Sequence, residues 1–273
     1  MSTRDRSRAV SSVTEIAIAV VLCAIVVLFL GLPIVAILDL ALRDTSFVDA
    51  VTSSQVTTAL RISLITTTFS LVCIILVGTP VAYILSRYRF PGRDFIDALI
   101  DLPIVLPPAV GGIGLLMAFG RRGLLGEWLD DAGITIAFTM TAVIMAQIFV
   151  SSPFYIRAAK AGFDSIGPDL ESVAHTLGSS RFEAFRRVAV PVAMPSLMAG
   201  AVMAWARALG EFGATIMFAG SFAGRTQTVP LAIYRGLETG LDVPLALSAI
   251  LIFISFAVLF TFRLLTRRAV VLS

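Results

Sequence analysis

Long apolar runs alternate with short polar segments along the whole chain. Each of six runs has at least about 20 residues, the length of helix that crosses a hydrocarbon core of about 30 Å. The runs span residues 14–38, 61–85, 99–119, 136–156, 196–219 and 243–263. Because these runs are apolar throughout rather than along one stripe, the pattern predicts an all-α, polytopic membrane protein with six transmembrane helices.

The composition agrees with a membrane protein. Hydrophobic residues make up 58% of the 273 residues and charged residues only 14%, whereas about 25% of a soluble domain is charged. The mean hydropathy is +0.94 and the sequence pI is about 9.2. A basic pI can indicate a nucleic-acid partner, but membrane topology explains it better here, so we expect the lipid bilayer and no nucleic acid as the partner.

Basic residues lie mainly on one side of the predicted membrane. Three precede the first run, three lie in the second gap, five in the fourth gap and three at the end of the chain, which makes 14 of the 21 Lys and Arg residues. Because such residues collect in cytoplasmic segments, both termini are predicted to be cytoplasmic. The expected divisions are a tail (1–13), a first helix with its outer loop (14–56), a main transmembrane domain (57–263) and a second tail (264–273).

One cytoplasmic segment, residues 167–191 (GPDLESVAHTLGSSRFEAFRRVAVP), is polar but patterned as two short helices. Pro168 suits the first position of a helix, and Gly178 suits the position just after its end. Ser180 and Glu183 then form the capping-box pattern of a second helix. The segment is too polar to enter the bilayer, so we expect two helices that meet at a glycine turn in the cytoplasm.

The first of these helices carries an apolar stripe at helical spacing. The stripe consists of Leu170, Val173, Ala174 and Leu177. A helix of about ten residues is marginal alone in water, so the stripe is expected to dock on another surface. That surface is either the rest of this chain or a soluble cytoplasmic partner. Pro191 is expected to close the second helix before the fifth run.

Residues for catalysis, metal binding or nucleotide binding are not indicated. The single histidine, His175, lies in the polar segment, and Cys23 and Cys73 lie in apolar runs, so neither a zinc site nor a disulfide is predicted. The sequence contains no G-x-x-x-x-G-K-[ST] loop for ATP and no G-x-S-x-G nucleophile elbow. We therefore predict a non-catalytic chain without a cofactor.

The polar segment resembles the cytoplasmic loop of ABC transporter permeases, whose pattern is E-A-A-x-x-x-G, nine residues, then I-x-L-P. Here Ser172-Val173-Ala174 takes the place of E-A-A, Gly178 that of the glycine, and residues 188–191 (VAVP) that of I-x-L-P. Ser172 replaces the glutamate of the motif, and Glu171 precedes it. In this family the loop is a coupling helix that sits in a groove of the ATPase subunit. The resemblance implies that role for Asp169, Leu170, Glu171, Ser172, Val173, Ala174, His175, Thr176, Leu177, Gly178 and Pro191.

Three further segments resemble the molybdate type within the molybdate and sulfate permease group. They are LPIVLPPAVGG (102–112), ARALGEFGATIMFAG (206–220) and GRTQTVPLAIY (224–234). The resemblance implies a type I ABC importer permease fold in a bacterial plasma or inner membrane. It also implies a homodimer around one path, two ABC ATPase subunits, an extracytoplasmic molybdate-binding protein, and molybdate or tungstate as the cargo. A permease for sulfate or thiosulfate is the nearest alternative.

Two charged residues, Arg207 and Glu211, lie one helical turn apart near the expected midplane of the fifth run. A charge at that depth costs about 2.5–3.5 kcal/mol on insertion scales, so an i, i+4 ion pair is expected. The pair either locks helices together or lies beside the anion path and helps to set the gate. Thr215, one turn further on, is a candidate hydroxyl donor to an oxyanion.

The third run contains Pro107, Pro108 and Gly111. Proline frees backbone carbonyls and glycine permits bending, which membranes tolerate where protein or a cavity covers the bend. We expect a bend here, either as part of a mobile gate or as a static kink.

Asp97 and Asp101 share one helix face at the cytoplasmic start of the third run. We expect them beside Arg93, stabilised by the helix N-terminus. If Asp97, Asp101 or Glu211 instead titrates, the chain is an ion-coupled secondary transporter, which is the more distant alternative.

The outer segment that follows the fifth run contains Arg225, Thr226, Gln227 and Thr228. We expect a polar re-entrant loop with a structural role. Contact with the binding protein and direct contact with the anion are the alternatives.

Overall fold

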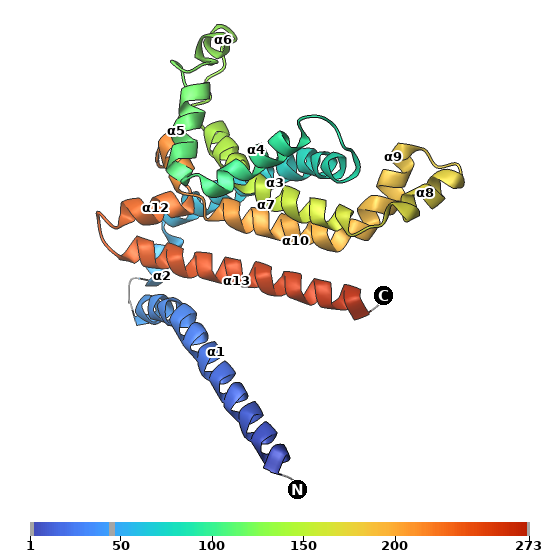
Figure 1. The fold of residues 1–273 in the computed structure, drawn as a ribbon. Helices are drawn as coiled ribbons and strands as arrows, with labels where there is room; N and C mark the ends of the chain where they lie inside the picture. The colour runs from blue at the N-terminus through green and yellow to red at the C-terminus, as the bar shows by residue number, and fades with distance from the viewer. Residues whose placement is uncertain (1–2, 44–46, 272–273) are drawn as a thin grey trace.

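The described part of the chain folds into a bundle of helices (Figure 1). The computed structural model describes residues 3–43 and 47–271, with side chains for 15–43, 47–167, 170–261 and 264. Five helices are long and apolar enough to cross a membrane, and a sixth crossing results if one sharply bent pair counts as a single span. The predicted all-α, polytopic architecture is confirmed.

The core lies where α7 (Met140–Asp164) packs between α3 (Ser54–Arg87) and α10 (Val190–Leu209). Small residues let these helices approach closely. A Cβ atom at Gly78 of α3 would lie 2.9 Å from the Tyr155 ring of α7, and one at Gly200 of α10 would lie 2.8 Å from the Ala158 Cβ. The three helices therefore form a tightly packed centre, which fixes the elements at both ends of the bundle.

Two long helices lie outside this centre (Figure 1). α1 (Thr3–Arg43) begins within the expected tail 1–13, contacts α13 (Asp242–Val271), and exposes its apolar side chains over the part from Glu15 onward. The expected tail 264–273 is likewise helical as far as Val271. The short α2 (Phe47–Thr52) connects α1 to the bundle.

Two predicted spans are broken rather than continuous. The third divides into α4 (Arg93–Val105) and α5 (Pro108–Phe119), which are bent by 117°. Proline at 107 and 108 has no backbone N–H to continue the helical ladder. The fifth divides after Leu209, and α11 (Gly213–Ala219) begins four residues later. The predicted span 196–219 is therefore made of two helical segments rather than one.

The segments beyond the two breaks pack on each other. A Cβ atom at Gly112 of α5 would lie 2.5 Å from the Ala214 carbonyl oxygen of α11. One at Gly213 would lie 3.0 Å from the Pro108 Cβ. The broken ends of α5 and α11 thus lie in close contact, with no room for a larger side chain at either glycine. The remaining elements toward the outer side are α6 (Gly126–Asp131) and α12 (Val229–Gly236).

The cytoplasmic segment forms α8 (Pro168–Thr176) and α9 (Arg181–Ala184), which project beyond the end of α7 and α10 (Figure 1). A π-turn, η1 (Phe185–Ala189), joins α9 directly to α10. The expectation that Pro191 closes the second helix is wrong, because the helix continues through it into α10. Proline is tolerated here because it occupies the first turn of α10, just after the wide turn.

Candidate functional site

The predicted pair of cytoplasmic helices is present. Gly178 has φ +89°, a left-handed conformation that glycine adopts without steric cost. The backbone N–H of Ser179 donates to the Ala174 carbonyl at 3.0 Å, which closes the end of α8. Ser180 and Glu183 form the predicted capping box at the start of α9. The His175 ring contacts the Ser179 carbonyl across the turn at 3.0 Å, so the only histidine helps to hold the turn.

Three of the four residues of the apolar stripe of α8 face away from the rest of the protein. Val173 is 57% exposed and Leu177 81% exposed, while Ala174 is only 9% exposed and marks the inner side of the helix. Leu170 is also exposed. Apolar side chains gathered at a projecting tip are typical of an interaction surface. This geometry argues against a stripe that folds back on its own chain. The side chain of Asp169 lies outside the described residues.

Glu171 anchors α8 to the cytoplasmic end of α3. Arg87 Nε donates to Glu171 Oε1 at 2.8 Å, and the Tyr83 hydroxyl donates to Oε2 at 2.6 Å. The Arg87 guanidinium also reaches the Ile166 carbonyl at 3.3 Å. Because Glu171 is only 7% exposed, its carboxylate serves the permease itself. We define Tyr83, Arg87 and Glu171 as the α8 anchor.

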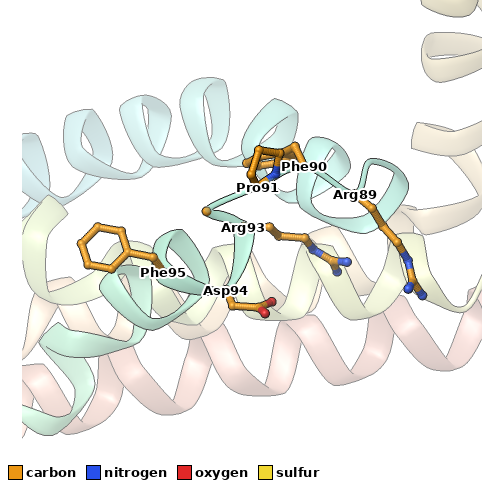
Figure 2. Close-up of a pocket in the computed structure, with 7 residues that line it drawn as sticks. Arg89, Phe90, Pro91, Arg93, Asp94 and Phe95 are labelled. Atoms are coloured by element: carbon orange, nitrogen blue, oxygen red, sulfur yellow. The ribbon is translucent and has the colours of Figure 1, made fainter.

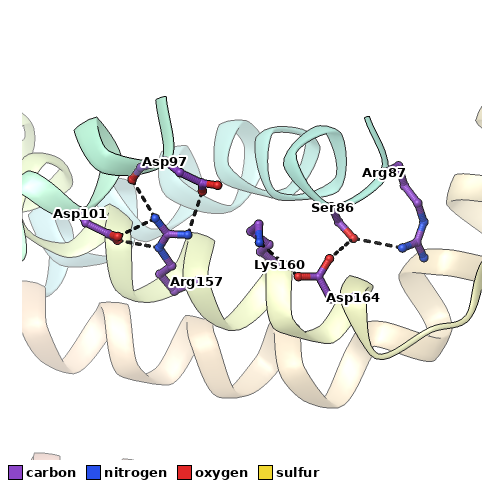
Figure 3. Close-up of polar contacts among 7 residues, drawn as sticks. All are labelled: Ser86, Arg87, Asp97, Asp101, Arg157, Lys160 and Asp164. Carbon is purple, nitrogen blue, oxygen red and sulfur yellow. Dashed lines mark hydrogen bonds and ion pairs between the residues drawn. The ribbon is translucent and has the colours of Figure 1, made fainter. Parts of the chain in front are cut away.

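The anchor continues along α7 through a further polar chain (Figure 3). Arg87 donates to the Ser86 hydroxyl at 3.0 Å, and Ser86 donates to Asp164 at 2.6 Å. Lys160 forms an ion pair with the other Asp164 oxygen at 3.2 Å. α8 is therefore tied to both α3 and α7, two of the three helices that form the core.

Replacing Glu171 by alanine is expected to loosen α8. Arg87 and Tyr83 would lose their acceptor, and a buried group left without a partner costs about 1–3 kcal/mol. Hydrogen–deuterium exchange over 170–177 should therefore become about tenfold faster. The matched control is Asp39→Ala in the exposed Asp39–Arg43 pair, where exchange should stay unchanged because such pairs contribute about 0–1 kcal/mol. Unchanged exchange in Glu171→Ala would contradict the anchor.

Asp97 and Asp101 bind Arg157 rather than Arg93, which corrects the sequence expectation (Figure 3). Arg157 Nε and Nη2 donate to the two Asp101 oxygens at 2.6 and 2.7 Å. Its Nη1 donates to Asp97 Oδ1 at 2.8 Å. Both carboxylates of α4 are thus held by one guanidinium of α7 in a bidentate and charge-assisted arrangement. They join α4 to the core, which argues against their use in ion coupling.

Arg93 instead begins α4, directly after the turn that follows α3 (Figure 2). With Arg89 and Phe95 it lines a pocket of about 330 Å³. Among the described side chains Arg93 forms no ion pair, and its Nε is buried without a hydrogen bond.

Arg207 and Glu211 form the predicted ion pair, but at the break of the fifth span. Arg207 Nη1 lies 2.8 Å from Glu211 Oε2, and the Glu211 side chain is fully buried. Within the described residues Glu211 Oε2 accepts no hydrogen bond, so this contact is an ion pair alone. Glu211 Oε1 accepts from the backbone N–H of Ala214 at 2.7 Å. Glu211 therefore links the end of α10 to the start of α11, a role that the sequence did not indicate.

Three fully buried hydroxyls have no hydrogen-bond partner among the described residues. They belong to Thr215 of α11, Ser151 of α7, and Thr228 at the start of α12. A buried hydroxyl without a partner is costly, so these groups stay available to a water molecule or a polar ligand. Pro107, Pro108 and Gly111, the other predicted path residues, lie at the break between α4 and α5.

The outer segment is largely buried rather than an exposed polar loop. Thr226, Gln227 and Thr228 are each at most 5% exposed, and only Arg225 extends outward. The Phe222 carbonyl accepts from three successive backbone N–H groups, those of Arg225, Thr226 and Gln227, at 3.0–3.1 Å. The segment is therefore a rigid turn between α11 and α12.

Sequence reasoning missed Tyr83, Arg87 and Arg157 as partners of the acids. The available signal was charge: Arg87 and Arg157 lie at the cytoplasmic ends of apolar helices, where a basic group either reaches headgroups or finds an acid. Which acid it finds depends on packing.

Comparisons with known proteins agree with this architecture. Residues 74–270 match the family described as binding-protein-dependent transport system inner membrane component. The chain is 43% identical over 229 residues to the molybdenum transport system permease protein ModB of Mycobacterium bovis, covering 84% of this chain and 86% of that protein. It is 36% identical over 222 residues to the sulfate transport system permease protein CysT of Escherichia coli, covering 81% and 80%.

Solved structures support the same fold. A chain of a bacterial alginate ABC transporter, in complex with an alginate pentasaccharide-bound periplasmic protein, superposes with a TM-score of 0.71 at 17% identity. The match covers 93% of this chain and 95% of that one. The family match and the identity to its relatives agree with the helical architecture described above. The chain therefore belongs to the family of binding-protein-dependent transport system inner membrane components, and it is an ABC transporter permease.

Proposed function

We propose that this permease forms the membrane path of an ATP-driven importer of molybdate, with tungstate as a second cargo. Two copies would enclose one path, two separate ABC ATPase subunits would dock on the cytoplasmic side, and an extracytoplasmic binding protein would deliver the anion. This chain would conduct the anion and transmit movement, while ATP hydrolysis would take place in the other subunits.

The observation that carries the proposal is the uncovered apolar stripe of α8. Leu170, Val173 and Leu177 are exposed at the cytoplasmic end of the bundle, and Glu171 on the inner side anchors the helix to α3. A partner can bind the exposed side of α8. If that partner moves, the anchored inner side of α8 transmits the movement to α3 and the core. The ATPase subunit is the partner that this geometry fits.

The similarity to two kinds of relative supports an oxyanion as the cargo. The molybdenum permease shares 43% identity with the chain, and the sulfate permease shares 36%. Molybdate, tungstate and sulfate are all tetrahedral dianions, so the same path chemistry suits each of them. The higher identity favours molybdate, and sulfate is the second candidate.

The path itself is best assigned to the two breaks. α5 and α11 come into close contact there at Gly112 and Gly213, and Arg207 and Glu211 lie at the break between α10 and α11. Thr215 adds a hydroxyl without a partner. We infer that coupled movement of α5 and α11 opens the path. The carboxylate of Glu211 would be kept neutralised by Arg207, because a bare acid would repel the anion.

The test is ATPase activity of the complex reconstituted in liposomes with its binding protein. Molybdate and tungstate are expected to stimulate hydrolysis and to accumulate inside the vesicles, whereas sulfate at the same concentration is not. Stimulation by sulfate alone would overturn molybdate as the cargo but would still support an ATP-driven importer. Uptake that persists without ATP and follows a proton gradient would overturn the importer itself.

A further inference from the structure

Two adjoining cavities open at the outer side of the molecule, between the start of α3, the 221–228 turn and α12. Their volumes are about 500 and 270 Å³, and both are lined by Gln55 and Gln227. Arg235 and Thr239 also line the larger cavity, and Ser54 and Thr58 the smaller one. The larger volume lies within the range of about 300–1,000 Å³ that is typical of ligand pockets. We call the two cavities together the outer recess.

The lining of the outer recess carries hydrogen-bond donors and one positive charge. Its polar side chains are hydroxyls, two amides and the Arg235 guanidinium, and no carboxylate of the described part of the chain lines either cavity. A guanidinium has five N–H donors. Among the described residues, only one of those in Arg235 is engaged, by Nη1 donating to the Ser221 carbonyl at 3.1 Å. Arg235 is therefore held in place with most of its donors available.

Gln227 is a polar side chain built into the protein at this recess. It is only 5% exposed, and its Nε2 donates to the Ser221 hydroxyl at 3.3 Å. Burying an amide is costly unless its hydrogen bonds are made. The surrounding turn is rigid, because the Phe222 carbonyl accepts three backbone bonds and the Thr226 hydroxyl accepts from the Phe222 N–H at 3.1 Å. The donors of the recess are thus preorganised rather than mobile.

The start of α3 adds to the positive potential. Ser53 caps this 34-residue helix, and the next two residues, Ser54 and Gln55, line the recess. The N-terminus of a long helix carries a partial positive charge that favours anions. An oxyanion accepts hydrogen bonds at every oxygen. It is therefore complementary to the arginine, amide and hydroxyl donors of the recess and to the positive end of this helix.

We propose that the outer recess is a low-affinity binding site for a tetrahedral oxyanion, the first position that the cargo occupies on the permease after its release. The inference rests on the proposed function, because it takes its ligand from the same class of cargo. The recess lies on the outer side, where the sequence topology places the start of α3, whereas the Arg207–Glu211 break lies deeper in the bundle. The recess would concentrate the anion before the path opens.

The test is equilibrium binding of radiolabelled molybdate to the complex in nanodiscs, without binding protein or nucleotide. The parent protein is expected to bind saturably in the millimolar to submillimolar range, with competition by tungstate. Arg235→Gln should weaken binding at least tenfold, and Gln227→Glu should abolish it by placing a negative charge in the recess. Arg225→Gln, an exposed arginine of the same turn that does not line the recess, should stay within twofold of the parent.

The outcomes separate this inference from the proposed function. Equal binding in the parent and Arg235→Gln, or no saturable binding in the parent, would overturn the recess even if ATP-driven molybdate uptake is intact. Saturable binding of sulfate but not molybdate would keep the recess and reject the cargo. Because Gln227 is buried, the elution profile and thermal stability of Gln227→Glu must match the parent. If the profile or the stability of Gln227→Glu differs, the result for Arg235→Gln alone tests the recess. Arg235 is exposed, so its replacement leaves the fold intact.

Discussion

Replacing both Val173 and Leu177 by aspartate is expected to separate the permease from its ATPase while the bundle stays folded. Both side chains are exposed, at 57% and 81%, so the substitution buries no charge in the free permease. In a docked complex the two carboxylates would be desolvated in an apolar groove, and central interface residues typically contribute about 2 kcal/mol or more each. Such a loss lowers affinity more than tenfold.

Co-purification of the ATPase subunit with tagged permease measures this effect directly. The double variant should retain less than about a tenth of the bound ATPase. The matched control is Leu124→Asp with Trp128→Asp, two apolar residues at 87% and 80% exposure that lie just before and within α6. That variant should keep its ATPase, since it also replaces two exposed apolar side chains by aspartate but on the other side of the membrane. Equal retention in both variants would show that α8 is not the docking element.

Adding a single methyl group at Gly112 is expected to disable transport. The Cβ of alanine there would lie 2.5 Å from the Ala214 carbonyl oxygen and 2.7 Å from its Cα, so backbone rather than a flexible side chain must move. Overpacking of this kind costs about 1–3 kcal/mol. It would also push α11 away from α5 at the two breaks. We expect Gly112→Ala to lower molybdate uptake at least tenfold.

Gly114, in the same helix, provides the matched control. A Cβ there meets nothing within 4 Å, and alanine favours a helix over glycine by about 1 kcal/mol. Gly114→Ala should therefore keep full uptake and the same or higher thermal stability. The measurement is uptake by proteoliposomes normalised to folded protein. Comparable uptake by the two variants would show that the close contact of α5 and α11 has no part in transport.

The elements that depend on length and local chemistry were predictable from the sequence. Runs of apolar residues identified α1, α3, α7 and α13, and Gly178, Ser180 and Glu183 identified the cytoplasmic pair of helices. Each of these signals acts over a few residues. The breaks were only partly predictable: Pro107 and Pro108 indicated the bend of the third span, whereas the break at 210–212 contains no proline.

The candidate site was harder to predict because its contacts join distant residues. Glu171 lies 84 positions from Arg87, and Asp97 lies 60 positions from Arg157. The sequence shows that an acid near a membrane interface needs a basic partner. Which of the several arginines becomes that partner depends on how the helices pack. The same applies to Glu211, whose role depends on a helix break rather than on its spacing from Arg207.

The π-turn η1 makes the link between α9 and α10 tolerant of a change in chain length. The N–H of Val190 bonds to the Phe185 carbonyl, five residues back, so this turn holds one residue more than an ordinary helical turn. Loss of a single residue between 185 and 189 would leave an ordinary helical turn, which closes nearly the same rotation with one residue fewer. The direction of α9 relative to α10 would therefore be kept. A deletion in the regular helix of α10 would instead rotate the elements on its two sides by about 100° relative to each other.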